Sequence, residues 1–265
     1  MMTMKVHKMK HVWLALAVSM LIVAGCKKDD DNGDSSTTPP VATFEMQVNL
    51  KVGTQPFVRN QGMTFSDGSA IRVENLRFYF SDVRLVREDG TEVMVNDVAY
   101  FTAGDGLDEE AQLMLTGYPE QSGNYKAVKL GVGLPADLNA SDPSSFDSND
   151  HPLHTFRNMH WGWAAKYKFI EMDARMDTLG NGTFDHSVVY HVGHDDFYDN
   201  SKTIDCEFEL NTGESFKLFT SIDLEAIFIN GTDPIDYRQD DLTHTTNSGY
   251  NLAERYYTNF VSAIQ

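Results

Sequence analysis

The chain has 265 residues, with 21 Lys and Arg against 39 Asp and Glu, and a formal net charge of −18 at pH 7. A negative field of this size repels phosphate backbones, so the composition excludes nucleic acid as a partner. The same field either concentrates cations near the protein or serves solubility alone, and composition leaves these two open.

The first 25 residues have the pattern of an export signal. Three lysines precede an apolar run, Trp13 to Val23, that is shorter than a membrane-spanning helix needs. Small residues stand directly before Cys26, which resembles the bacterial lipobox. The resemblance implies a lipoprotein signal peptide over residues 1–25 and a diacylated Cys26 as the mature N-terminus. An uncleaved anchor is the alternative, and either one predicts an exported, membrane-tethered protein.

Residues 26–40 are predicted to form a disordered acidic tether. After Cys26 the sequence is KKDDDNGDSSTTPP, which has no apolar residue to support order. An acidic run at this place resembles signals that send lipoproteins to the cell surface in Bacteroidetes. We therefore expect a lipid-anchored protein of the bacterial cell envelope, at the outer membrane, with surface exposure as one option. Loss of residues 1–25 removes three lysines and no acidic residue, so the formal charge becomes −21.

The second cysteine is expected to be a buried thiol. A lipid on Cys26 leaves Cys206 alone, so no disulfide can form within the mature chain. Cys206 lies on the apolar side of the alternating segment Ile204 to Leu210, which favours a buried thiol over a metal ligand. Residues 41–265 are long enough for one sizeable core, and we expect them to form a single domain.

Alternation with a period of two residues dominates this domain and predicts β-strands. In the segment Phe44 to Val52, apolar and polar residues alternate as they do in a half-buried strand. Turn signals such as Asp89-Gly90 and Asn181-Gly182 separate similar segments. Strands are expected over residues 44–52, 75–86, 92–98, 125–132, 166–172, 184–192, 203–210 and 215–222.

Helical signals are scarce. A short turn is expected over residues 224–228, and a longer helix at the end of the chain. There Asn251 and Glu254 have the spacing of a capping box, and apolar residues follow at helical spacing: Leu252, Tyr256, Phe260 and Ile264. The predicted fold class is all-β, an antiparallel β-sandwich with a short C-terminal helix.

Six of the nine histidines lie within residues 151–194, which also hold both tryptophans of the mature chain, Trp161 and Trp163. Neutral imidazole is the commonest metal ligand in proteins, so the clustering favours a metal site. Histidines satisfied in polar loops, with the tryptophans in the core, are the alternative that spacing alone leaves open. His186 and His191 fall on opposite faces of one predicted strand, so a single ion cannot take both unless a bulge intervenes.

The kind of metal is only partly restricted by the sequence. Neither HExxH nor a CxxC pair occurs, so the common zinc signatures are missing. Imidazoles without thiolate suit copper as well as zinc. A calcium loop starting at Asp177 would need oxygen ligands where Leu179 and Val188 stand, so a hairpin turn is the preferred interpretation there. No GxSxG motif supports nucleophilic catalysis.

Four sequence blocks carry a family resemblance. They are Leu76–Leu85 with LRFYFSDVRL, Ser122–Pro135 with a G-x-Y…G-x-G-x-P pattern, Met159–Phe169 with MHWGW and YKF, and Tyr190–Gly193 with YHVG. Together they resemble the MbnP-like copper-binding proteins, named for the partner protein encoded with methanobactin systems, over most of residues 43–265. Lys166 departs from the pattern, because the family usually has a glycine before the tyrosine at this place.

The resemblance implies a β-sandwich, export and a single copper ion held by histidines. In relatives, a tryptophan is oxidised to kynurenine, whose aryl amine can bind copper, by a dihaem enzyme of the cytochrome c peroxidase/MauG type. Carried over, the modified residue would be Trp161 or Trp163. The ligands implied are His160 and His191, with His154, His194 and His244 held in reserve.

The sequence therefore predicts an exported lipoprotein that binds one copper ion for acquisition or storage, and that is not an enzyme. A dihaem peroxidase-type partner and a membrane reached through the lipid are expected. The alternative is a surface binding or adhesion module that binds no metal. A metal-dependent enzyme is disfavoured, because no motif places a general base near the histidines.

Overall fold

The structure is a computed structural model and describes residues 40–104, 112–162, 166–229, 233–245 and 249–265. Its contacts divide the chain into two units, residues 1–39 and a compact unit from Pro40 to Gln265. The predicted signal peptide, Cys26, most of the tether and Trp163 lie outside the described residues. No helix in the described part of the chain is long and apolar enough to cross a membrane.

β-Strands dominate the compact unit, which confirms the predicted all-β class. The first sheet is built on β1 (Thr43–Val52), where every second side chain is buried. β1 pairs in parallel with β13 (Ser215–Asp223), and antiparallel with β6 (Gln112–Gly117) and the short β2 (Gln55–Pro56). The parallel pair departs from the antiparallel arrangement expected throughout, because local alternation does not specify which strand will be the partner.

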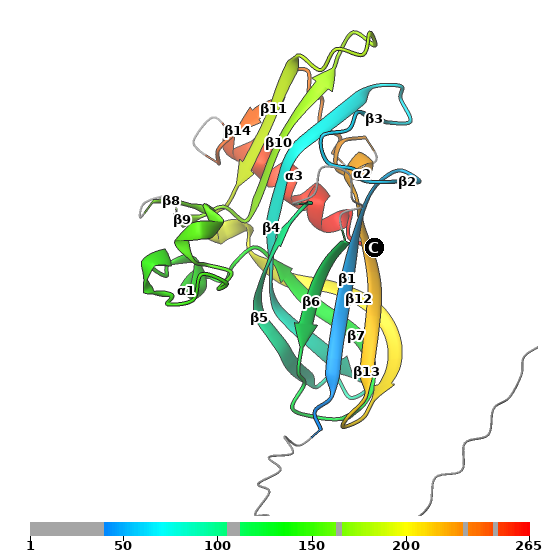
Figure 1. The fold of residues 1–265 in the computed structure, drawn as a ribbon, viewed down its shortest axis with the longest axis vertical. Helices are drawn as coiled ribbons and strands as arrows, with labels where there is room; N and C mark the ends of the chain where they lie inside the picture. Colours follow the sequence, from blue (N-terminus) through cyan, green and yellow to red (C-terminus); the bar gives the residue numbers. More distant parts are fainter. Residues whose placement is uncertain (1–39, 105–111, 163–165, 230–232, 246–248) are drawn as a thin grey trace, which may run out of the picture. The chain divides into compact units, whose positions relative to one another are not determined.

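The second sheet is larger and has the strand order β12-β7-β4-β10-β11-β14. Its longest strand, β4 (Ala70–Arg87), pairs with β10 through its first half, and with β5 and β7 through its second half. Figure 1 shows β4 running through the domain from the β10–β11 end to the β7–β12 end. The other strands are β3 (Met63–Thr64), β5 (Glu92–Thr102), β7 (Gly123–Val132), β10 (Ile170–Asp177), β11 (His186–Val192), β12 (Asp199–Leu210) and β14 (Leu242–Thr243).

A long connection between β7 and β10 carries short elements beside the sandwich (Figure 1). Asn139, at the end of α1, anchors it from a buried position: its Oδ1 accepts from Tyr167 N at 3.0 Å, and its Nδ2 donates to Asp195 Oδ1 at 2.7 Å. The elements are α1 (Ala136–Asn139), two 3-10 helices (Pro143–Ser145 and Thr155–Arg157), and the two-stranded pair β8 (His160–Gly162) and β9 (Lys166–Tyr167). A third 3-10 helix, Asp195–Phe197, follows β11.

Aromatic side chains fill the core and join it to the C-terminal helix. The ring of Phe78 lies 5.1 Å from that of Phe101 and 5.3 Å from that of Phe260 on α3 (Tyr250–Ser262). Full burial of each such ring contributes about 1.5 to 3 kcal/mol to folding. The predicted apolar face of the helix is confirmed, since Tyr256 and Phe260 are completely buried. The expected short turn is also present as α2 (Leu224–Phe228).

The predicted capping box is wrong. The helix starts one residue before Asn251, with Gly249 at its N-cap position and no side-chain capping bond. Thr243 Oγ1 donates to the carbonyl of Gly249 at 2.7 Å, so a contact from β14, and not a side chain of the helix itself, holds the start of the helix.

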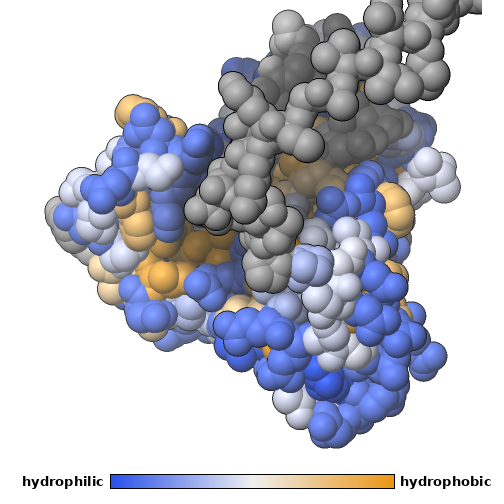
Figure 2. All heavy atoms as spheres, turned by 60° about the horizontal axis from the view of Figure 1, so that its bottom comes forward, coloured by the Kyte–Doolittle hydropathy of each residue, from blue (hydrophilic) through white to orange (hydrophobic). Residues whose placement is uncertain are grey.

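Viewed towards the end of the domain where β1 begins, the surface is largely hydrophilic, with hydrophobic residues gathered in one hollow (Figure 2).

Candidate metal centre

The β10–β11 hairpin places polar side chains on the face of the sheet away from α3. Its register is symmetrical about the Asn181 turn, so Glu171 lies directly opposite His191. Alternation sends Met172 and Tyr190 into the core, with Tyr190 stacked on Tyr256 at 4.6 Å. His191 therefore faces the other side, as the sequence pattern predicted.

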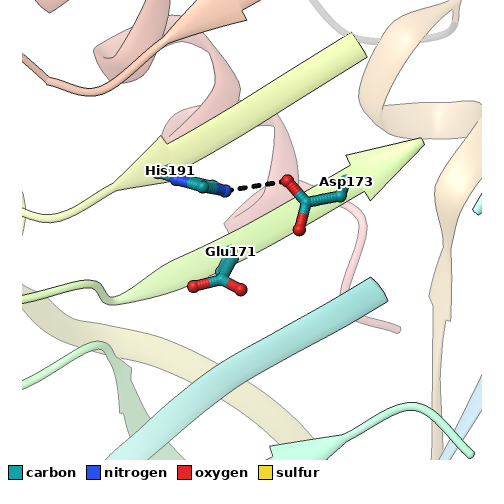
Figure 3. A group of neighbouring side chains, drawn as sticks. All are labelled: Glu171, Asp173 and His191. Atoms are coloured by element: carbon teal, nitrogen blue, oxygen red, sulfur yellow. Dashed lines mark hydrogen bonds and ion pairs between the residues drawn. The ribbon is translucent and has the colours of Figure 1, made fainter. Parts of the chain in front are cut away.

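Three potential ligands meet on this face. One ligand atom from each of Glu171, Asp173 and His191 lies within 4.8 Å of the other two. His191 Nε2 lies 2.8 Å from Asp173 Oδ1. Figure 3 shows these two side chains pointing toward each other from neighbouring strands, with Glu171 beside them. In the described ranges, this is the one group of three such side chains.

Glu171 forms the buried floor of this group. Its side chain is 2 % exposed and makes ion pairs with Arg77 Nη2 and Lys168 Nζ. Asn75 Nδ2 donates to Glu171 at 2.6 Å and to Asp173 at 3.1 Å, which links the two carboxylates. A buried carboxylate needs such partners, because desolvation of an isolated charge is very costly. Glu171 Oε2 has no hydrogen bond within the described residues, so its ion pair with Lys168 provides its compensation there.

Asp173 is held in its charged form. Burial by itself would raise the pKa of Asp173, but hydrogen bonds from His191 and Asn75, with the positive charges of His191 and Arg77, lower this pKa below its ordinary value. Asp173 therefore stays a carboxylate under neutral and mildly acidic conditions. It can act as a ligand oxygen or hold the His191 ring in one orientation, as carboxylates beside metal-bound histidines do.

A second imidazole adjoins the group. The ring of His244 lies 4.9 Å from that of His191, at an interplanar angle of 58°. Partial desolvation, followed by the positive charge of His191, lowers the pKa of His244, and Asp173 only partly opposes this. His244 is therefore neutral near pH 7 and keeps a nitrogen lone pair, which a metal ligand requires.

Two of the predicted ligands cap short helices in this structure. His154 Nδ1 accepts from Phe156 N at 3.2 Å, and His194 Nδ1 accepts from Asp196 N at 3.2 Å, so both rings cap 3-10 helices. A neutral imidazole that accepts at Nδ1 carries its proton on Nε2, which leaves no lone pair for an ion. The structure does not bring these two histidines into the group around His191.

His160 lies on β8 with its ring 4.7 Å from that of Tyr167. Partial burial lowers the pKa of His160, with the charge of Asp142 acting in the opposite direction. The carbonyl of Tyr167 packs against Gly193, where an added Cβ would approach it to 2.3 Å. The partner strand of β8, β9, thus lies next to the end of β11, although the three-residue group around His191 does not include His160.

Trp161 and Gly162 follow His160 on β8, and Trp161 is half-buried. Gly162 has a φ of +143°, a conformation that glycine adopts without steric cost, and this explains the glycine. The space beside it is open, because an added Cβ there would meet no atom within 4 Å. Trp163 and Cys26, the other predicted modification positions, lie outside the described residues. Cys206 is a free thiol whose pKa is raised by burial, but it is only half-buried and so is less enclosed than the predicted buried thiol.

Two members of the group, Glu171 and Asp173, were missed by the sequence reasoning. A signal for them existed, because a hairpin centred on Asn181 already pairs residue 171 with residue 191. Carboxylates spaced two residues apart on the partner strand must then share a face with His191. The contributions of Arg77 from β4 and His244 from beyond β14 had no comparable local signal.

The donor set suits a borderline divalent cation. Imidazole nitrogen favours zinc, copper, iron and nickel, and a mixture of nitrogen and oxygen ligands in a tetragonal arrangement is typical of copper(II) or nickel(II). Carboxylate oxygens alone would favour magnesium or calcium instead. His191, Asp173 and Glu171, with His244 beside them, therefore fit a copper ion by donor type.

The fold and this group define a β-sandwich protein with a candidate metal centre on the β10–β11 face. The chain belongs to the MbnP family, which it matches over residues 41–250. This confirms the resemblance carried by the sequence blocks. Among solved structures the chain is similar to MbnP from Methylosinus trichosporium, with 15 % identity, 72 % of this chain and 79 % of that chain covered, and a TM-score of 0.45. No curated protein matches the chain.

Lys166, where the sequence departs from the family resemblance, has a φ of +57°. This left-handed conformation costs a residue with a Cβ about 1 to 2 kcal/mol, whereas glycine adopts it freely. The departure noted in the sequence is therefore a site of backbone strain. Lys166 makes an ion pair with Asp195, which offsets part of that cost.

Proposed function

We propose that this protein is an exported copper-binding protein that holds one copper ion on the β10–β11 face, for acquisition or storage and without turnover. The observation that carries the proposal is the convergence of His191, Asp173 and Glu171 within 4.8 Å of one another. Membership of the MbnP family supports copper as the cation.

The three residues of the group differ in exposure, and we assign their roles accordingly. The Asp173 side chain is 35 % exposed and the His191 side chain 17 %, so an ion arriving from solvent meets these two first. Glu171 lies beneath them and is already compensated by Arg77 and Lys168. We therefore assign His191 and Asp173 as primary ligands, with Glu171 as a supporting charge. The formal charge of −21 after loss of residues 1–25 raises the local concentration of cations around the protein.

His160, Trp161 and Trp163 belong to the same proposal as a modified part of the site. Oxidation of Trp161 or Trp163 to kynurenine by a dihaem peroxidase-type partner would supply an aryl amine as a further copper ligand. The proximity of β8 to Gly193, through Tyr167, supports a contribution from this segment. Measurement of the intact mass of protein from its native host, followed by peptide mapping, tests for the modification.

The proposed location follows from the N-terminal sequence. A lipid on Cys26 and the acidic tether up to Pro40 would hold the domain at the outer membrane of the bacterial envelope. Replacement of Cys26 by Ser should then release the protein from the membrane fraction. An unchanged membrane fraction for this variant would contradict lipid anchoring at this residue.

Metal analysis tests the site itself. Protein made with its native partner should contain about one copper per chain, and His191→Ala and Asp173→Asn should lose most of it. His160→Ala tests the β8 contribution separately. The matched control is His186→Ala, because His186 bonds to Tyr237 O and Asp241 instead of belonging to this group. Full copper loading in His191→Ala would overturn the ligand assignment, and a copper-free parent would overturn the function.

A binding or adhesion module without metal is the second candidate. The specific observation in its favour is that Arg77 and Lys168 already neutralise Glu171, so the polar group can be a purely structural network. Titration calorimetry separates the two functions. A folded parent that gives no heat with copper or zinc would support the module.

A further inference from the structure

The segment that carries His244 is fastened to the end of β11. Leu242 and Thr243 of β14 pair in parallel with Val189 and Tyr190 of β11. Val189 N also donates to the carbonyl of Asp241 at 2.7 Å. The segment comes from beyond α2, about 50 residues further along the chain than β11, so tertiary pairing alone brings it to the metal face.

Thr245 links this segment to the end of β11 and has a strained backbone conformation. Its φ is +57°, in the left-handed region that a β-branched residue rarely adopts. Its Oγ1 donates to the carbonyl of His191 at 3.0 Å and accepts from Gly193 N at 3.1 Å. Its own N–H donates to Thr243 Oγ1 at 3.1 Å. Strain of this kind persists where surrounding bonds over-determine it, and such positions concentrate at functional sites.

The result is a fixed place for His244 directly after β14. Its ring faces that of His191, and the charges of Asp173 and Lys168 act on it. Neither nitrogen of His244 makes a hydrogen bond to any residue that the structure describes, whereas His186 and His194 are both bonded. A solvent-facing imidazole held beside a second imidazole and a carboxylate has the chemistry of a metal ligand.

We propose that His244 is a second imidazole ligand of the metal centre, and that Thr245 is the residue that positions it. The inference rests on the proposed copper function and deepens it, because it assigns a ligand from a separate segment of the chain. The centre would then bind a borderline divalent cation such as copper(II) through His191, His244 and the carboxylate of Asp173.

The test titrates the purified full chain with copper(II) alone and counts ligand nitrogens by electron paramagnetic resonance. The parent should show two imidazole nitrogens at the copper. His244→Ala should show one and bind copper more weakly than any Thr245 variant does. Thr245→Val keeps the side-chain shape and loses the hydroxyl, so we expect about tenfold weaker binding, in the range seen for residues that orient metal ligands. Thr245→Ser keeps the hydroxyl and should restore the parent spectrum.

The outcomes separate the inference from the function on which it rests. Copper bound by His244→Ala with two nitrogens and parent affinity would overturn the inference alone. Equal spectra and affinities for Thr245→Val and the parent would remove the positioning role. A parent that binds no copper(II) would remove the function and the inference together. Circular dichroism of each variant establishes that it is folded, and His186→Ala serves as the imidazole control with an unchanged spectrum.

Discussion

The histidines of the loops and those of the sheet face differ in what their ring nitrogens contact. In the loops, Nδ1 of His154 and Nδ1 of His194 each accept a hydrogen bond from the backbone N–H two residues further along the chain. On the sheet face, His191 contacts the carboxylate of Asp173, and the ring of His244 faces that of His191. The comparison teaches that clustering in sequence does not distinguish a cap from a ligand, because the distinction lies in what each nitrogen contacts.

The sheet face itself depends on Glu171, which gives the largest expected effect on stability. Glu171→Gln removes the counter-charge of the buried Lys168 and of the mostly buried Arg77. We expect the free energy of unfolding to fall by about 3 to 5 kcal/mol, as measured by urea denaturation. The control is Glu74→Gln, whose exposed pairs with Arg72 and Arg175 should account for less than about 1 kcal/mol. Equal losses of unfolding free energy in the two variants would mean that Glu171 does not belong to a buried ionic network.

The dependence of stability on acid pH tests whether Asp177 binds backbone N–H groups, in contrast with Glu171, which binds cationic side chains. Asp177 accepts N–H groups of Leu179, Asn181 and Gly182 in the β10–β11 turn, and these bonds outweigh burial to lower the pKa of Asp177 below 3.8. A lowered folded pKa stabilises the protein above about 3.8, and this contribution is lost as the pH falls through the folded value.

We therefore expect the parent to lose stability below about pH 4 more steeply than Asp177→Asn does, in thermal unfolding across a pH series. Copper binding at neutral pH should be the same in both proteins, because this carboxylate already serves the turn. Parallel pH profiles would contradict the assigned role of Asp177.

The loop histidines offer the sharpest test of the opening comparison. His154→Ala removes the bond to Phe156 N, so it should destabilise the protein by about 1 kcal/mol, as loss of a helix cap does. Copper content should stay at the parent level, in contrast with His191→Ala. A drop in copper content with His154→Ala would restore this residue to the ligand set and break the comparison.

The smallest expected effect concerns backbone strain near the site. Lys166→Gly relieves the positive φ at the cost of the exposed ion pair with Asp195, so the free energy of unfolding should rise by up to about 1 kcal/mol. Lys166→Ala loses the ion pair and keeps the strain, so it should be less stable than the parent. If the glycine and alanine variants unfold at the same denaturant concentration, the positive φ of Lys166 does not strain the backbone.

Local patterns alone determined much of this protein. Alternation of apolar and polar residues located the main strands, placed His186 and His191 on opposite faces, and put Cys206 on the half-buried side of β12. The four sequence blocks identified the MbnP family, which the match over residues 41–250 confirms. These inferences succeeded because side-chain direction along a strand depends only on position, and a family motif is itself local.

The tertiary structure decided which of those faces meet. Arg77 reaches Glu171 because β4 pairs with β10, and His244 reaches His191 because β14 docks on β11 in parallel. The parallel pairing of β1 with β13 and the start of α3 at Tyr250 were settled in the same way. A strand carries the same alternation whichever neighbour it pairs with, so the choice of partner depends on long-range packing that no local sequence pattern contains.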